Sequence, residues 1–197
     1  MFFLICMDNI SFTSRIKLVS NEDFARLIPK GTKSVDFPWT ISESVLGKSA
    51  LTKDIYDCTS AGIVADGEVL LMHLSPNGGN YKTLNKVEKF ITQKINLFSQ
   101  NIQGFLIGSK KNNINSPNST KLFDKFEKLL NKHNIPYSKF KGGNYNNNIA
   151  YLGDKDTWLI SNDVVDLTKS VYRNDKKQVT KFMFDDVKIS NNDILEV

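Results

Sequence analysis

The dipeptide Asp66-Gly67, set between two short apolar runs, is the feature that most constrains how this 197-residue chain can fold. Asp-Gly favours a two-residue type I′ turn, because both central residues of that turn need positive φ. Counting outward from the turn along both runs places Ser60 opposite His73 and Cys58 opposite Ser75. The pattern therefore predicts a β-hairpin with a defined register.

One face of this hairpin carries a candidate nucleophile and a candidate base. Side chains alternate between faces along a strand, so Cys58, Ser60, His73 and Ser75 share one face. Cys58 and His73 are then diagonal neighbours, roughly 7–8 Å apart at the backbone and within reach of each other. A thiolate–imidazolium pair is the usual sulfur nucleophile at neutral pH. The pair favours a cysteine-dependent hydrolase; the alternative is that Cys58 is a small apolar core residue.

The composition is typical of one ordinary domain. Apolar residues make up 40% of the chain, and 13 of them are Phe, which is enough for a core. The two cysteines, Cys6 and Cys58, do not make a disulfide framework, so we expect a reducing compartment and a free thiol at Cys58. The apolar run at residues 2–6 is too short for a secretory signal or a membrane span. We therefore expect a soluble chain.

The net charge of +5 invites a nucleic-acid interpretation that the residue types argue against. Arg occurs only at positions 15, 26 and 173, whereas base and phosphate recognition favours the guanidinium fork. The lysines form scattered pairs rather than a stripe. We expect a solvated basic face and no nucleic-acid partner.

Periodicity beyond the hairpin alternates helices with strands. Apolar residues at helical spacing predict a helix over 82–99, and Asn118 or Ser119 caps a second helix that ends before Pro136. Strands are expected over residues 102–107, 135–140, 149–152 and 157–160. The alternation predicts an α+β (mixed α/β) fold, either a β-sandwich or a mixed sheet, flanked by helices.

We expect residues 1–197 to form a single domain. The organised core spans residues 45–161, preceded by strands and loops in residues 1–44 and followed by a C-terminal extension over 162–197. His133, near the end of the second predicted helix, is expected to complement the helix C-terminus rather than to bind a ligand. No cluster of residues has metal-ligand spacing, so no metal is expected.

The order of elements over residues 45–161 resembles that of the chemotaxis glutamine deamidase CheD. It also resembles the cysteine deamidases that include the cytotoxic necrotizing factor toxins and Burkholderia lethal factor. In that set a Thr precedes the nucleophilic Cys by six residues and a His follows on the next strand. Here Thr52 precedes Cys58 by six, and His73 follows within Leu71-Met-His-Leu-Ser-Pro76. The downstream helix, strand, loop, helix, strand and final hairpin are also similar to CheD.

The resemblance implies a CheD-like fold and the roles of three residues. Cys58 would be the nucleophile, His73 the base, and Thr52 the group that orients the imidazole; the hairpin register makes Ser60 a second candidate for that last role. The implied reaction is hydrolysis of an exposed Gln side chain on a partner protein, with no metal or organic cofactor. The protein would act in the bacterial cytoplasm, or in a host cytosol as a delivered effector or toxin.

One departure from the family concerns the residues before the nucleophile. The family has small residues there, a Gly and a Ser, whereas this chain has Tyr56 and Asp57. A carboxylate beside the thiol disfavours the thiolate. Two alternatives therefore stay open: a weakened or inactive deamidase-like binding module, and another thiol hydrolase. If the protein is an active enzyme, the loops at 75–81 and 108–118 would shape the choice of partner.

Overall fold

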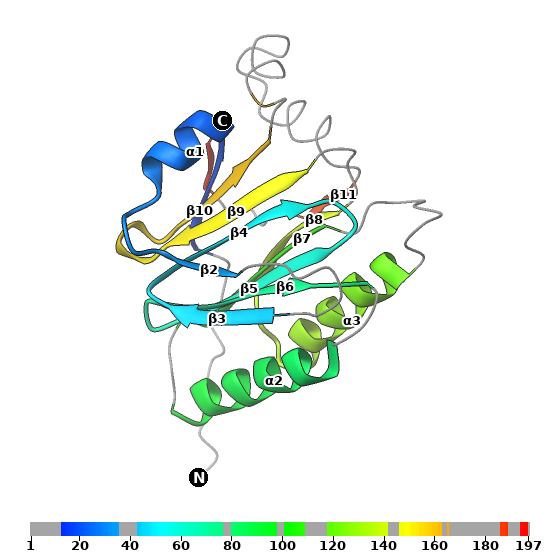
Figure 1. Cartoon of the computed structure of the whole chain (residues 1–197). Coiled ribbons are helices and arrows are strands. Elements are labelled where there is room, and N and C mark those ends of the chain that lie inside the picture. Colours follow the sequence, from blue (N-terminus) through cyan, green and yellow to red (C-terminus); the bar gives the residue numbers. More distant parts are fainter. Residues whose placement is uncertain are drawn as a thin grey trace.

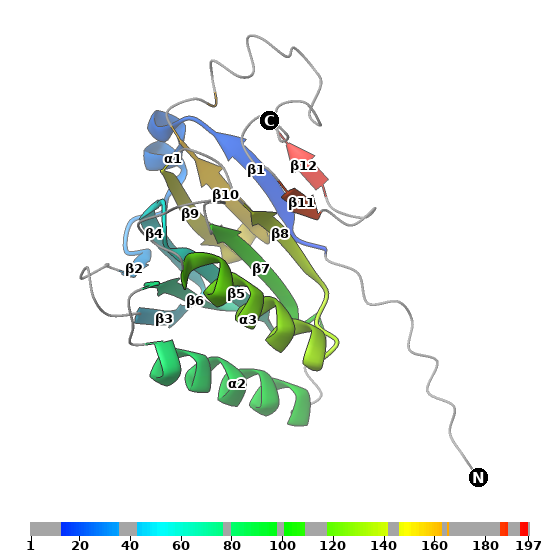
Figure 2. The same ribbon diagram turned by 90° about the vertical axis from the view of Figure 1, so that its right-hand side faces the viewer.

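The structure is a computed structural model that describes residues 13–35, 43–76, 80–97, 101–108, 118–141, 146–162, 165, 186–188 and 194–196. Two β-sheets pack face to face (Figure 1). Helix α1, Asn21–Leu27, covers the outer face of the first sheet. Helices α2, Asn80–Asn96, and α3, Asn118–Lys132, lie side by side on the outer face of the second (Figure 2). The described residues therefore form a β-sandwich flanked by helices, which confirms the α+β class.

Each sheet has six strands among the described residues, and each is mixed. The first has the order β12-β1-β10-β9-β4-β2, with bounds β1 Arg15–Val19, β2 Lys33–Val35, β4 Ser49–Ile55, β9 Asn147–Leu152, β10 Thr157–Ser161 and β12 Ile194–Glu196. The second has the order β11-β8-β7-β5-β6-β3, with bounds β3 Glu43–Gly47, β5 Thr59–Ala65, β6 Glu68–Leu74, β7 Gln103–Gly108, β8 Tyr137–Lys141 and β11 Asp186–Lys188.

The hairpin of β5 and β6 has the predicted register. Ser60 pairs with His73, and the strands run antiparallel up to the turn. Asp66 and Gly67 have φ values of 53° and 75°, as a type I′ turn requires. Both strands lie in the middle of the second sheet and are almost entirely buried. The hairpin prediction is confirmed from Thr59 and Leu74 to the turn, whereas Cys58 and Ser75 lie just outside the paired residues.

The downstream elements also follow the sequence pattern. The structure has both predicted helices, both single strands and the final antiparallel hairpin, with a short 3-10 turn, η1 Gly153–Lys155, between β9 and β10. Only strands and loops were expected in residues 1–44, and helix α1 corrects that expectation. Ser20 caps α1 by accepting from the Asp23 backbone N–H at 3.0 Å, and Phe24 is buried. The Ser cap followed by acidic residues was the local signal for this helix.

The two sheets are joined by an aromatic core. Trp158 of β10 stacks on Phe105 of β7 with 4.3 Å between ring centroids. Gly62 of β5 makes room for the indole, because a Cβ there would lie 2.2 Å from the Trp158 ring. Close packing of this kind leaves little freedom for one sheet to slide over the other.

Segments outside residues 45–161 also take part in the sheets. β1 lies inside the first sheet, between β10 and β12. β11 pairs with β8 at the edge of the second sheet. At the start of β1, the Ser14 hydroxyl donates to Asp156 at 2.5 Å and accepts from the Gln103 amide of β7. These hydrogen bonds link the two sheets at the end of the sandwich opposite the candidate site.

Candidate active site

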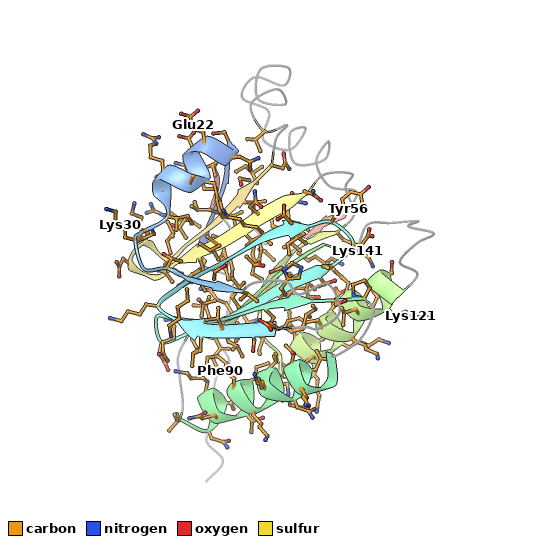
Figure 3. The ribbon with its side chains drawn as sticks, in the orientation of Figure 1. Glu22, Lys30, Tyr56, Phe90, Lys121 and Lys141 are labelled. Carbon is orange, nitrogen blue, oxygen red and sulfur yellow. The ribbon has the colours of Figure 1, made fainter. Side chains whose placement is uncertain are left out.

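The predicted site residues lie at one end of the sandwich and come from both sheets. Thr52 is on β4 of the first sheet, and His73 is near the end of β6 in the second. Cys58 directly precedes β5. The labelled residues Tyr56 and Lys141 mark this end of the molecule in Figure 3.

Thr52 and His73 meet across the space between the sheets. Thr52 Oγ1 lies 2.8 Å from His73 Nδ1, and both residues are fully buried. The same hydroxyl donates to the Val35 carbonyl of β2 at 3.2 Å. A carbonyl can only accept, and a hydroxyl has one proton, so Oγ1 must accept from an Nδ1–H of His73. The bond therefore selects the tautomer whose Nε2 holds the lone pair of a general base.

Ser60 is the cross-strand neighbour of His73 in the second sheet. It is fully buried, and its hydroxyl makes no hydrogen bond within the described part of the chain. On its other side Ser60 pairs with Ile107 of β7, which is apolar. Thr52, not Ser60, is thus the residue that hydrogen-bonds the imidazole in this structure.

The backbone of Cys58 is held close to Gly108, the last residue of β7. A Cβ on Gly108 would lie 2.3 Å from the Cys58 carbonyl oxygen, and Gly108 has φ of +122°. Both the close approach and the φ value require glycine. Sequence reasoning missed this residue, because a Gly that ends a strand is a weak signal.

A β-bulge leads the chain from Thr52 to Cys58. The pairing of β4 with β9 shifts register between Thr52 and Ile55, and Asp54 within it has φ of 58°. The Asp54 backbone N–H donates to Asn148 Oδ1 at 3.2 Å. Bulges commonly re-aim a strand beside a functional site. Here the bulge lets the chain turn from the first sheet into the second within a few residues.

Burial controls the electrostatics of Cys58 and His73. Burial, and secondly the charge of Asp57, raise the pKa of Cys58 from 9.0 to about 12. Burial lowers the pKa of His73 from 6.5 to about 4. The site at neutral pH is therefore a neutral thiol with a neutral imidazole, rather than the ion pair expected from the residue types.

The size of these shifts shows how strongly the neutral pair is favoured. Moving the thiol proton to the imidazole across pKa values of about 12 and about 4 costs about 11 kcal/mol. The neutral pair is therefore the resting state of the site before a ligand arrives.

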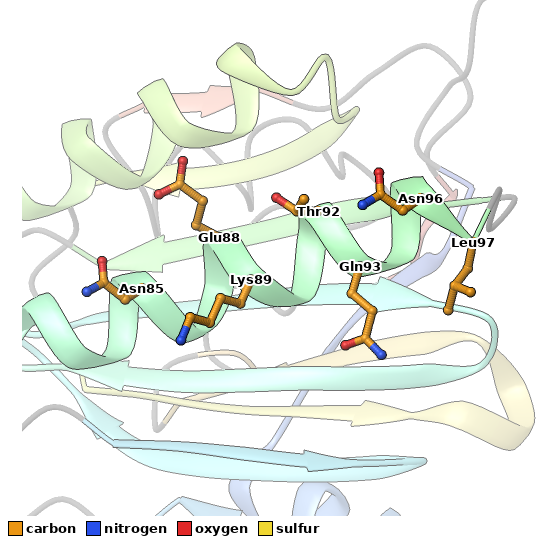
Figure 4. Close-up of a pocket in the computed structure, with 7 residues that line it drawn as sticks. All are labelled: Asn85, Glu88, Lys89, Thr92, Gln93, Asn96 and Leu97. Atoms are coloured by element: carbon orange, nitrogen blue, oxygen red, sulfur yellow. The ribbon is translucent and has the colours of Figure 1, made fainter.

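Two hollows on the surface lie away from these residues. The first follows α2 and is lined by Asn85, Glu88, Lys89, Thr92, Gln93, Asn96 and Leu97 (Figure 4). The second, of about 570 Å³, is lined by parts of β1, α1 and the β9–β10 turn. Neither is lined by a Cys or a His, so the chemistry of a thiol and an imidazole is confined to the Cys58 region among these sites.

Some predicted features lie outside the described residues. These are Cys6, residues 77–79 of the first predicted loop and 109–117 of the second. His133 Nε2 lies 3.9 Å from Glu88 Oε1, between α3 and α2. The described part of the chain holds no group of three or more His, Cys, Asp or Glu residues suited to a metal ion. Among the described helices, none is long and apolar enough to cross a membrane.

Comparison with known proteins adds no family to this picture. No protein-family model matches the chain, and no curated protein matches it.

Proposed function

We propose that this protein is a cysteine-dependent glutamine deamidase, which hydrolyses a Gln side chain on a partner protein to Glu. The observation that carries the proposal is the hydrogen bond from Nδ1 of His73 to Thr52, next to strand β5, which Cys58 directly precedes. That bond prepares a base on one strand for a nucleophile just before the neighbouring strand. The same three residues carry the resemblance to CheD and to the necrotizing factor toxins.

In the proposed reaction, Sγ of Cys58 attacks the carboxamide carbon of the glutamine. Nε2 of His73 takes the thiol proton and passes it to the departing ammonia, which leaves a thioester. Water then attacks the thioester, the C–S bond breaks and glutamate is released. Backbone N–H groups around Cys58 would meet the negative charge on the carbonyl oxygen.

General-base catalysis suits a site whose resting pair is neutral. The proton moves only as sulfur attacks the carbon, so a stable thiolate is not required. A neutral imidazole is also the form that can accept the proton, and the low pKa of His73 keeps it neutral throughout the physiological range. The raised pKa of Cys58 opposes the attack, and part of that opposition comes from Asp57.

The same raised pKa favours a second candidate, a non-catalytic binding module on the same sandwich. In that case Cys58 would be a packing residue, and its replacement would leave partner binding unchanged. A third class, another thiol hydrolase such as a peptidase, differs in its product: it would cleave backbone instead of releasing ammonia.

The proposal is tested with cell extracts, because they sample many exposed glutamines. A bacterial and a eukaryotic cytosolic extract are each treated with the wild type, Cys58→Ser or His73→Ala. Conversion of Gln to Glu is measured by mass spectrometry, together with ammonia. We expect conversion of Gln to Glu at a few sites, and only with the wild type. Conversion in the bacterial extract would indicate a bacterial target, and conversion in the eukaryotic extract would indicate a host target. Equal ammonia and no conversion with all three proteins, in both extracts, would overturn the proposal.

A further inference from the structure

Ser60 is a buried polar residue at this end of the sandwich, and the reaction above does not use it. Its side chain is fully buried, and its hydroxyl has no hydrogen-bond partner in the described part of the chain. A buried hydroxyl without a partner is a cost to folding, and such groups in native proteins call for an explanation. An ordered water or a reacting group at this position would provide one.

Ser60 lies next to the imidazole-bearing residue His73 in the sheet. Its two cross-strand neighbours are His73 and Ile107, and only the first can hydrogen-bond. Directly paired residues have Cβ atoms roughly 4.5–5.5 Å apart. At such a spacing, one water can hydrogen-bond to the His73 ring and to the Ser60 hydroxyl at the same time, even though the hydroxyl does not bond the ring directly. Thr52 already occupies Nδ1, so Nε2 is the nitrogen on which such a water would lie.

Cys58 lies at the same end of the second sheet. It occupies the bend immediately before β5, two residues ahead of Ser60. The thioester would therefore form beside the Ser60 hydroxyl and the imidazole.

We propose that Ser60 holds the water that hydrolyses the thioester, between its hydroxyl and Nε2 of His73. This inference rests on the proposed function and deepens it. The water oxygen bonds to the thioester carbon, and Nε2 takes one of its protons. The C–S bond breaks, and the Cys58 thiolate takes that proton from the imidazolium. The new carboxylic acid releases its proton to solvent. Ser60 acts as a positioning residue that favours hydrolysis over transfer of the acyl group to an amine.

Thr59 offers a matched control. Its hydroxyl is also buried and has no hydrogen-bond partner among the described residues. It is the neighbour of Ser60 on the same strand, so its side chain points to the opposite face, where Ala61 and Ile63 pack under the helices. Thr59→Val and Ser60→Ala each remove one orphan hydroxyl, but only the second removes it beside His73.

The experiment measures how the thioester divides between water and an amine. The probe is the blocked dipeptide N-benzyloxycarbonyl-Gln-Gly, with hydroxylamine as the competing amine; glutamate and hydroxamate products are both quantified. The ratio of the two products comes from the same active molecules, so partial misfolding of a variant does not change it. We expect Ser60→Ala to lower the ratio of hydrolysis to transfer about tenfold, the effect of one lost hydrogen bond to the reacting water. Thr59→Val should leave the ratio unchanged.

The outcomes separate this inference from the proposed function. If the wild type deamidates but Ser60→Ala keeps the wild-type ratio, the role of Ser60 is wrong and the deamidase proposal stands. If both variants shift the ratio equally, the effect is general to orphan hydroxyls and the inference also fails. If the wild type releases no more ammonia than Cys58→Ser, from the dipeptide or from either extract, both proposals fail together.

Discussion

The electrostatics of Cys58 give the most direct prediction. In a Cys6→Ser background Cys58 is the remaining thiol, and its alkylation by iodoacetamide reports its thiolate fraction. A pKa of about 12 instead of 9.0 lowers that fraction about 10³-fold at neutral pH. A more basic thiolate is a better nucleophile, which returns about 20-fold. We therefore expect alkylation about 50-fold slower than that of a free cysteine, with no plateau below pH 10.

Asp57→Asn tests the charged part of this shift. Loss of the carboxylate removes the second cause of the raised pKa and leaves burial, the larger cause, in place. Alkylation should become several-fold faster and still remain slower than that of free cysteine. The control is Asp54→Asn, a nearby exposed carboxylate at φ of 58°, a conformation that Asn tolerates; its alkylation rate should equal that of the starting protein.

One result would refute the reasoning. If alkylation levels off below pH 8.5, and this behaviour is lost with His73→Ala, Cys58 and His73 form an ion pair at rest. Burial would then not govern the site as the structure indicates.

Three further predictions concern stability, each measured by urea unfolding. The pKa of His73 is lowered from 6.5 to about 4, so the neutral imidazole contributes stability above pH 6.5 that is lost as the pH falls to 4. His73→Gln should therefore remove about 3 kcal/mol of the acid-induced loss of stability. An unchanged pH profile would contradict this. Thr52→Val leaves both the His73 Nδ1–H and the Val35 carbonyl without this hydrogen-bond partner and should cost about 2–4 kcal/mol of stability. Thr52→Ser keeps the hydroxyl and should cost about 1 kcal/mol. Equal losses would rule out the inferred hydrogen-bond chain. Gly108→Ala places a Cβ 2.3 Å from the Cys58 carbonyl oxygen and should cost at least about 3 kcal/mol of stability. Gly67→Ala, at φ of +75° in open space, should cost about 1 kcal/mol. A small loss for Gly108→Ala would show that β5 and β7 can separate.

Local patterns made the hairpin and most downstream elements predictable. Asp66-Gly67 determines the register of β5 and β6, because a two-residue turn leaves no freedom in the count outward along the strands. Once that register is set, the pairing of Ser60 with His73 follows. The helices α2 and α3 were predictable because an apolar stripe at helical spacing is a local property of the sequence.

Helix α1 was missed although its signal was also local. It has seven residues, and so short an apolar pattern is outweighed by the Pro and Gly residues that follow it. Its stability comes from packing Phe24 onto the first sheet, which no local pattern shows.

The sequence by itself determined the hairpin, its register, and the residue types that make Cys58, His73 and Thr52 a candidate set. Only the tertiary structure decided which hydroxyl bonds the imidazole. Thr52 and His73 belong to different sheets, and their contact depends on how the sheets pack. The Val35 carbonyl and the close approach of Gly108 arise in the same way. Burial likewise belongs to the folded sandwich, and it converts an expected ion pair into a neutral thiol and a neutral base, because water is excluded from the space that the two sheets enclose.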